Sequence, residues 1–144
     1  MPHTLNLTTE IDVDVRASIV AQVVAYNNSH AGPGNGSALF VLLRNEMGEV
    51  EGGLLGATSR GWLFVDFLVV SATLRSQGMG SKMMNVAEKE AISRGCTNAW
   101  LNTFEFQARG FYEKLGYECF GELPNYPVAF SRYFMKKSLS ASKQ

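Results

Sequence analysis

The amino-acid sequence predicts an α/β (α+β) fold, in which one mixed central sheet of about six to seven strands carries helices on both faces. Short runs rich in β-branched and aromatic residues alternate along the chain with stretches whose apolar residues recur at helical spacing. The three middle strand runs are separated by turns too short to hold a helix, which indicates an antiparallel meander. The third of these runs is nearly continuously apolar, as expected for a strand covered on both faces.

The length and composition indicate one globular domain. The chain has 144 residues and contains no repeat or low-complexity linker, so we expect a single domain over residues 1–144. The 13 basic and 13 acidic residues cancel, which gives no overall field that would favour nucleic acid or a membrane surface. No apolar run approaches the roughly 20 residues needed to span a bilayer, and the first residues lack the pattern of a signal peptide. A cytoplasmic protein is expected.

The two cysteines, Cys96 and Cys119, do not have the spacing typical of metal-binding or redox motifs. Both lie among apolar residues, so we expect buried free thiols. No metal site is predicted.

Two elements are expected before the meander. The alternation from His3 to Thr8 predicts a short first strand. Asp12 or Asp14 can cap the helix that follows. The apolar residues of this helix would share one face: Val15, Ile19, Val20, Val23 and Val24. The helix is expected to end near Asn27 or Asn28, before a glycine-rich loop.

The three strands of the meander are expected at Ala38–Arg44, Glu49–Thr58 and Trp62–Ser71. The turns between them contain glycine, asparagine and serine, which favour turns. Glycine has no side chain to pack, so the second strand is expected to be weakened by Gly52, Gly53 and Gly56.

Five further elements are expected after the meander. They are a helix from about Gly78 to Arg94, a strand at Asn98–Thr103, a short helix at Gln107–Lys114, and two strands at Tyr117–Phe120 and Val128–Met135. Both helices are followed by a glycine, Gly95 and Gly116, which can adopt the left-handed conformation that ends a helix. The polar tail, residues 138–144, is expected to be frayed.

The strongest functional signal lies between the apolar strand and the long helix, in the stretch Leu74-Arg75-Ser76-Gln77-Gly78-Met79-Gly80-Ser81-Lys82. The first turn of a helix has N–H groups without intrahelical partners and the positive end of the helix dipole. Gly78 and Gly80 keep side chains away, so the backbone from Gln77 to Ser81 can close on a phosphate. Arg75 adds a cation. The alternative is a glycine turn that only starts a helix.

Two common phosphate-binding motifs do not fit this stretch. The spacing of the P-loop is missing, and Met83 stands where a dinucleotide fingerprint needs its last glycine. What remains is Arg75-x-x-Gly78-x-Gly80, which resembles the acetyl-CoA motif of the GNAT superfamily of N-acetyltransferases. The segment from Gln107 to Tyr117, Gln-Ala-Arg-Gly-Phe-Tyr-Glu-Lys-Leu-Gly-Tyr, resembles the second signature of that family.

The order of the expected elements is also that of the GNAT fold. The resemblance covers roughly Ala38 to Met135, and the N-terminal strand and helix fit it by order only. It implies a sheet that is splayed at an acetyl-CoA cleft between the strands Trp62–Ser71 and Asn98–Thr103. It also implies transfer of an acetyl group from acetyl-CoA, as co-substrate, to a primary amine of a small molecule or peptide by direct attack.

The same resemblance implies where acetyl-CoA binds. The pyrophosphate would lie on the backbone of the glycine turn, and the pantetheine arm would pair with the end of the apolar strand like an added strand. The residues expected at this site are Leu68, Val69, Val70, Arg75, Ser76, Gln77, Gly78, Met79, Gly80 and Ser81.

Amine attack on a thioester requires a base and an acid. The resemblance implies Tyr112 as general acid, because a phenol of pKa ~10 stays protonated at neutral pH and can donate towards a departing thiolate. The alternative is that Tyr112 only packs its helix on the sheet. Asp66 is the first candidate base, with a structural hydrogen bond as its alternative, and Glu105 is the second. Glu105 replaces an asparagine frequent in the family, whose pantetheine contact could pass to Asn102 or Gln107.

The acceptor site is expected in the Asn27–Gly36 loop, the segment from Phe104 to Gln107 and the Pro124–Arg132 region. Four aromatic residues suggest an apolar or flat acceptor surface, although core packing also explains them: Phe104, Phe106, Tyr126 and Phe130. Arg109 and Arg132 could meet a substrate carboxylate, although such arginines are more often solvated. A non-catalytic acyl-CoA-binding module and a pure interaction domain remain alternatives, and the exposed terminal strands make a homodimer plausible. The identity of the amine stays open.

Overall fold

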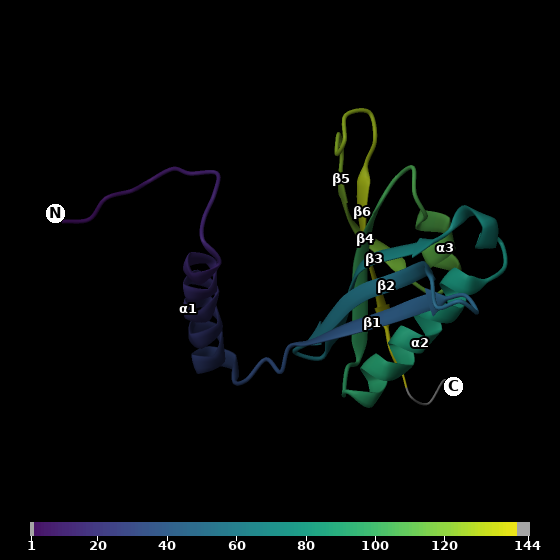
Figure 1. The fold of residues 1–144 in the computed structure, drawn as a ribbon, viewed down its shortest axis with the longest axis horizontal. Coiled ribbons are helices and arrows are strands. Elements are labelled where there is room, and N and C mark those ends of the chain that lie inside the picture. Colours follow the sequence, from purple (N-terminus) through teal and green to yellow (C-terminus); the bar gives the residue numbers. More distant parts are fainter. Residues whose placement is uncertain (1, 141–144) are drawn as a thin grey trace. The chain divides into compact units, whose positions relative to one another are not determined.

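The computed structural model describes residues 2–140 and divides into two parts after Gly34, which are treated separately here (Figure 1). The first part contains one helix, α1 (Val13–Ala31). The second part contains the sheet and the remaining helices: β1 (Ser37–Arg44), β2 (Val50–Ser59), β3 (Trp62–Val70), η1 (Ala72–Leu74), α2 (Met79–Ser93), β4 (Asn98–Phe104), α3 (Arg109–Lys114), β5 (Glu118–Leu123) and β6 (Arg132–Ser138).

The predicted first strand is wrong, because residues 3–8 form neither strand nor helix. The hydroxyl of Thr8 donates to the carbonyl oxygen of Glu10 (2.9 Å) and accepts from the Glu10 N–H (3.2 Å). Such a local turn uses backbone groups that a strand would offer to a neighbour. A strand also needs a paired neighbour, and the described residues before Gly34 contain none.

The helix α1 begins where the sequence predicts and ends later. Asp12 occupies the N-cap position with an extended backbone, although its side chain makes no cap hydrogen bond. The end expected near Asn27 or Asn28 is wrong, because the helix continues to Ala31. Gly32 then adopts φ +76° and its N–H bonds to the Asn28 carbonyl oxygen (2.9 Å), which supplies the stop.

The second part is built on a six-stranded sheet with the order β1-β2-β3-β4-β6-β5, which confirms the predicted α+β class. Only β3 and β4 pair in parallel, and the other neighbours are antiparallel. The sheet is open, with β1 and β5 at its edges. The homodimer stays a prediction that rests on these two edges.

The last hairpin begins and ends later than predicted. Tyr117 precedes β5, and β6 starts at Arg132 rather than at Val128. The Tyr126 N–H bonds to the Phe130 carbonyl oxygen (2.8 Å), so the chain between the strands folds back on itself as a turn. The hairpin projects beyond the ends of the other strands (Figure 1). Of the tail expected to be frayed, Ser138 ends β6 and residues 141–144 lie outside the described residues.

The core lies between the sheet and α2, which packs against β1, β2 and β3. The largest fully buried side chains come from α2 and from four strands: Met84, Leu54, Leu63, Leu101 and Met135. Cys96 is buried here as a free thiol, as expected, and burial raises its pKa. Cys119 is only partly buried, so the prediction of full burial is wrong for that thiol.

A β-bulge interrupts β3 at Asp66. Leu55 of β2 pairs with Phe67 and the next residue, Gly56, pairs with Val65, so Asp66 is the extra residue. A Cβ at Gly56 would collide with the backbone oxygen of Phe64, so the bulge needs glycine at this position of β2. This glycine therefore permits close approach of the strands.

The parallel pairing of β3 with β4 ends just before the bulge, at Val65 and Leu101. The rest of β3, through Val70, has no partner on that side, while β4 continues to Phe104 beside β6. These are the two strands between which the resemblance implies a splay.

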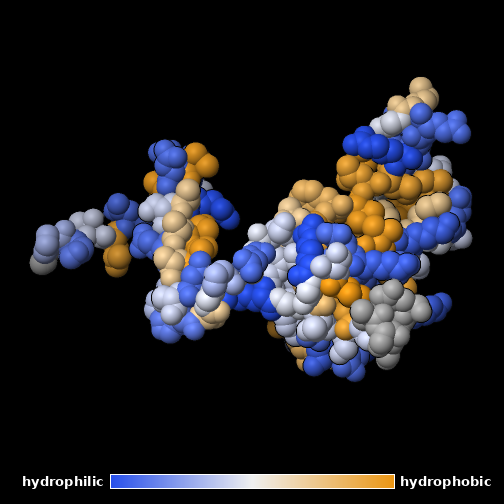
Figure 2. All heavy atoms as spheres, turned by 90° about the horizontal axis from the view of Figure 1, so that it is seen from below, coloured by the Kyte–Doolittle hydropathy of each residue, from blue (hydrophilic) through white to orange (hydrophobic). Residues whose placement is uncertain are grey.

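Several apolar side chains of this sheet are exposed on the face away from the core. They are Phe40 and Leu42 of β1, Leu55 of β2, and Phe67 and Val69 of β3. Figure 2 shows apolar areas on the surface of this part of the chain. None of the helices within residues 2–140 is long and apolar enough to cross a membrane.

Candidate functional site

A cleft of about 730 Å³ lies where β3 ends and α2 begins. Its size is within the range of small-molecule sites. It is lined by the end of β3 (Leu68, Val69, Val70), by the turn and first residues of α2 (Leu74, Arg75, Ser76, Gly78, Met79, Gly80, Ser81), and by the chain around α3 (Phe106, Gln107, Ala108, Phe111, Tyr112). All residues predicted to bind acetyl-CoA lie on this cleft except Gln77.

The turn before α2 has the conformation expected of an anion-binding site. Ser76 (φ +70°) and Gly78 (φ +78°) are both left-handed, and Gly78 caps the helix. The first bond into α2 runs from the Lys82 N–H to the Gly78 carbonyl oxygen (3.1 Å). The N–H groups of the preceding turn, from Met79 to Ser81, therefore have no intrahelical acceptor.

Arg75 and Gln77 support this turn through their side chains. The Arg75 Nε donates to the Val70 carbonyl oxygen (3.2 Å), which holds the guanidinium beside the turn. The Gln77 side chain donates to the Thr73 carbonyl oxygen (3.2 Å) and does not line the cleft. Arg75 thus adds positive charge at the site, and Gln77 stabilises the turn.

Tyr112 is the titratable residue of α3 that lines the cleft. Its side chain is 8% exposed and packs in the core, with ring centroids 5.0 Å from Phe111 and 5.9 Å from Tyr117. Burial raises the pKa of Tyr112. At neutral pH the phenol is therefore protonated and can act as a donor towards a group in the cleft.

Asp66 lies on the other side of the sheet. Leu63 and Val65 point into the core under α2, whereas the bulge leaves both Asp66 and Phe67 exposed. Neither a hydrogen bond nor an ion pair joins the Asp66 carboxylate to another residue between 2 and 140. Asp66 is in register with the gap between β3 and β4, opposite the side from which Tyr112 packs.

Glu105, the second candidate base, is held by Ser131. The Ser131 N–H donates to Glu105 Oε1 (2.8 Å), and the Glu105 N–H donates to the Ser131 carbonyl oxygen (2.8 Å). The Ser131 hydroxyl also donates to Glu122 (2.6 Å). These bonds join the end of β4 to the hairpin, so Glu105 has a structural role there.

The two candidate replacements for the family's asparagine differ in position. Asn102 accepts hydrogen bonds from Arg132 and does not line the cleft. Gln107 lines the cleft, and its Oε1 accepts from the Phe104 N–H (2.8 Å). This bond leaves the Gln107 amide N–H₂ available, so Gln107 is the better placed of the two.

The four predicted acceptor-site aromatics are brought together in one ring cluster (Phe104, Phe106, Tyr126, Phe130). Phe106 stacks on Phe104 (5.2 Å) and meets Phe130 edge-on (5.2 Å), and Tyr126 lies 6.0 Å from Phe104. Since Phe106 also lines the cleft, the ring cluster is continuous with it.

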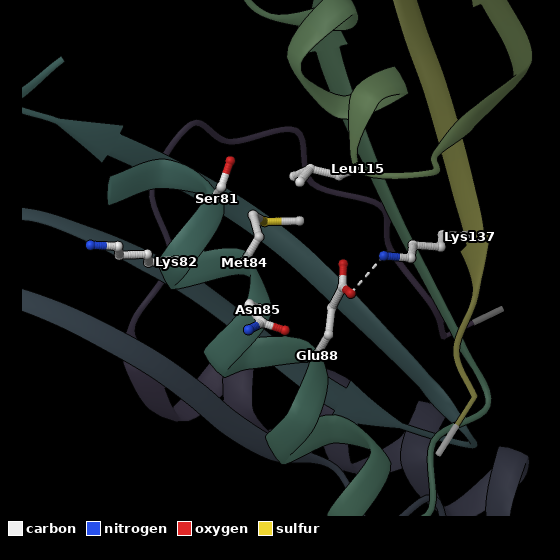
Figure 3. Close-up of a pocket in the computed structure, with 7 residues that line it drawn as sticks. All are labelled: Ser81, Lys82, Met84, Asn85, Glu88, Leu115 and Lys137. Atoms are coloured by element: carbon white, nitrogen blue, oxygen red, sulfur yellow. Dashed lines mark hydrogen bonds and ion pairs between the residues drawn. The ribbon is translucent and has the colours of Figure 1, made fainter. Parts of the chain in front are cut away.

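A second, smaller hollow of about 340 Å³ lies along α2 (Figure 3). At its edge Glu88 accepts from Lys137 of β6 (2.8 Å) and from the hydroxyl of Tyr117 (2.8 Å), whereas Lys82 points away from this ion pair. Burial and the Glu88 charge raise the pKa of Tyr117.

Sequence reasoning missed this arrangement around Glu88. The sequence carried no signal for it, because Lys137 lies 49 positions from Glu88. Within residues 2–140, no group of His, Cys, Asp and Glu side chains could hold a metal ion.

Comparisons with known proteins agree with these features. The model of the acetyltransferase (GNAT) family matches residues 16–117. An acetyltransferase of Agrobacterium fabrum is 37% identical over 81% of this chain and 85% of its own length. Blasticidin-S acetyltransferase of Streptomyces morookaense is 39% identical over 65% of this chain and 70% of its own length. A crystal structure from Agrobacterium tumefaciens, of a protein assigned as an acetyltransferase, has a TM-score of 0.89 at 33% identity and covers 94% of this chain and 99% of its own.

Proposed function

This chain belongs to the acetyltransferase (GNAT) family, and from this premise we propose that it acetylates a primary amine of a small molecule or peptide by direct attack, with Tyr112 as general acid. As a member of the family it is an acyltransferase that uses acetyl-CoA as co-substrate. One observation supports the proposal most: the turn before α2, the unpaired edge of β3 and Tyr112 all line one cleft.

The cleft residues would divide the binding of acetyl-CoA among them. The backbone N–H groups from Met79 to Ser81 and the Arg75 guanidinium would bind the pyrophosphate, by charge-assisted hydrogen bonds of about 1.5–3 kcal/mol each. The backbone of Leu68 to Val70, which has no strand partner on the β4 side, would pair with the pantetheine arm. Gln107 would add a side-chain donor from the opposite wall.

The proposed step moves two electron pairs, the nitrogen lone pair and the C–S bonding pair, and two protons. The amine nitrogen attacks the thioester carbon, a C–N bond forms, and the C–S bond breaks. Tyr112 donates its proton to the departing sulfur and regains one from solvent. The attacking nitrogen loses its proton to a base, for which we propose Asp66, directly or through water, because it is exposed at the gap on the face opposite Tyr112.

Glu105 is the second choice as base. Its Oε1 already accepts a hydrogen bond from the Ser131 N–H, so one of its two oxygens is engaged in holding the hairpin. The name of the Streptomyces relative indicates a small-molecule acceptor for that protein, and at 39% identity this supports a small molecule over a peptide here.

Thiol release on mixing the protein with acetyl-CoA and a panel of primary amines tests the proposal. Amine-dependent release with a matching acetylated product supports it. Binding of CoA, seen as a raised melting temperature, without release on a wide panel would leave the chain a binding module and contradict the proposal.

A further inference from the structure

Arg132 and Arg109 have different environments, although both lie over aromatic rings. The Arg109 guanidinium lies 4.4 Å above the Tyr133 ring and forms an ion pair with Glu113 (3.2 Å). Arg132 lies over two rings, Phe104 (4.7 Å) and Tyr126 (4.8 Å), and forms no ion pair with any residue between 2 and 140.

The orientation of the Arg132 side chain is fixed, although no carboxylate between residues 2 and 140 forms an ion pair with it. Its Nε (2.9 Å) and Nη2 both donate to Asn102 Oδ1, while the ring faces of Phe104 and Tyr126 flank the guanidinium. Its remaining N–H groups have no acceptor in the described part of the chain. A planar cation held in this way loses little freedom when it binds an anion with a matching fork of oxygens.

The two carboxylates of this region that could neutralise Arg132 are held elsewhere. Glu105 and Glu122 both accept hydrogen bonds from Ser131, the residue before Arg132. Asp66 is a further carboxylate, exposed on β3 just after the pairing with β4 ends. The loops around Ser131 therefore carry one cation without an ion pair and two carboxylates, which is complementary to a molecule that carries both charges.

The position of Arg132 connects this charge pattern to the cleft. The ring of Phe104 under the guanidinium stacks on Phe106, which lines the cleft together with Tyr112. On the other side, Asn102 follows Leu101, the last residue of β4 that pairs with β3. Arg132 is thus connected to the cleft through Phe104, and to the gap between β3 and β4 through Asn102.

We propose that the acceptor of this enzyme is an amine that also carries a carboxylate, an amino acid or a molecule of similar charge, and that Arg132 binds the carboxylate. The inference rests on the proposed function and names the substrate class of the same site. The ring cluster provides apolar walls for the body of such a substrate, since Phe106, Tyr126 and Phe130 are exposed. Of the carboxylates named above, that of Asp66 receives its ammonium end. Phosphate also fits an arginine fork, but these carboxylates disfavour an anion with two charges.

Substrate pairs that share a side chain and differ in the carboxylate test the inference. Because the carboxamide also lowers the pKa of the neighbouring amine, the ratio for wild type is compared with the ratio for Arg132 variants. Phenylalanine with phenylalaninamide, and methionine with methioninamide, give the ratio of kcat/KM for carboxylate and carboxamide. We expect a preference for the carboxylate, and Arg132→Gln should lower the ratio of kcat/KM for carboxylate and carboxamide by about tenfold or more. Arg132→Lys should restore only part of it, because lysine lacks the planar fork. The matched control is Arg109→Gln, which should leave the ratio unchanged.

The outcomes separate this inference from the proposed function. A ratio that is the same in wild type and in Arg132→Gln overturns the inference while the acetyltransferase stands. Faster acetylation of O-phosphoethanolamine than of β-alanine also overturns it. If no amine is acetylated, the proposed function fails, and calorimetric binding of the same pairs to the CoA-loaded protein still decides whether Arg132 selects a carboxylate.

Discussion

The hydroxyl of Tyr117 donates a hydrogen bond of 2.8 Å to Glu88, and so links the chain before β5 to the middle of α2. Lys137 of β6 reaches the other oxygen of the same carboxylate at 2.8 Å. The side chains of Lys137 and Glu88 are only 25% and 12% exposed. One carboxylate therefore satisfies two partly buried donors from two different segments, and its removal would leave both unpaired.

Replacing Glu88 is expected to destabilise the fold strongly. Glu88→Ala leaves the Lys137 ammonium and the Tyr117 hydroxyl without their acceptor, at a cost of about 2–4 kcal/mol. Urea unfolding measures this change. The control is Glu90→Ala in the same helix, whose more exposed pair with Arg94 contributes less than about 1 kcal/mol. Equal losses in the two variants would contradict the role of Glu88.

The stability of the protein should fall at alkaline pH. Burial raises the pKa of Tyr112, and burial with the Glu88 charge raises that of Tyr117. Above pH ~10 the unfolded chain loses these protons before the folded protein does, so the free energy of unfolding falls with pH, by up to about 1.4 kcal/mol per pH unit for each tyrosine. Below pH ~10 the two groups contribute no slope. Urea titrations between pH 8 and 11 in wild type and Tyr117→Phe test this, and a variant with an undiminished slope would refute it.

Removing the Tyr112 hydroxyl should slow turnover and leave binding intact. Tyr112→Phe keeps the ring that packs in the core and loses the proton donor, so we expect kcat to fall tenfold or more, the range for losing a general acid. The affinity for acetyl-CoA should stay near the wild-type value. Tyr117→Phe, a neighbouring buried tyrosine that does not line the cleft, serves as control and should keep kcat. An unchanged kcat in Tyr112→Phe would exclude the hydroxyl from the step.

The two candidate bases can be separated by matched amide substitutions. Asp66→Asn is expected to lower kcat/KM by about a hundredfold, in the range for loss of a general base, with little change in stability because the side chain is exposed at the bulge. Glu105→Gln is expected to change activity little and to lower stability slightly, since it weakens the bond from the Ser131 N–H. Steady-state kinetics with urea unfolding gives both readouts, and the reverse pattern would assign the base to Glu105.

The left-handed glycine at the turn offers a paired test of the phosphate site. Gly78 (φ +78°) and Gly95 (φ +90°) have open space where a Cβ would be added, so substitution by alanine introduces backbone strain without a clash. Each change should cost about 1 kcal/mol of stability. Only Gly78→Ala should raise the KM for acetyl-CoA, by about tenfold if the turn shifts enough to lose one charge-assisted hydrogen bond. An equal effect of both variants on the KM for acetyl-CoA would argue against phosphate binding by the turn at Gly78.

The sequence was sufficient where local chemistry decides the structure. Gly78, Gly95 and Gly116 all have positive φ, and each lies at the helix end predicted from its position. The nearly continuous apolar run of β3 correctly predicted a central strand. These features depend on a few neighbouring residues, so a single sequence reveals them.

Features that depend on distant pairs were not predictable. Glu88 meets Lys137 across 49 positions, and Arg132 meets Asn102 across 30, so no local pattern points to either contact. The distinction between Arg109 and Arg132 likewise appears only when their partners are known. The strand predicted at residues 3–8 failed for a similar reason, since alternation alone does not supply a neighbouring strand.

The extra residue at Asp66 divides β3 into two segments with opposite rules for substitution. Up to Val65 the odd-numbered side chains are buried, and from Leu68 the even-numbered ones pack towards the core, while Phe67 and Val69 are exposed. Deleting one residue at this point would turn the last segment over and present the wrong backbone edge and side chains to the cleft. In a library of variants, polar residues should therefore be tolerated at 67 and 69 but not at 63 and 65. Odd-numbered positions of the same strand would thus differ in their tolerance before and after the bulge.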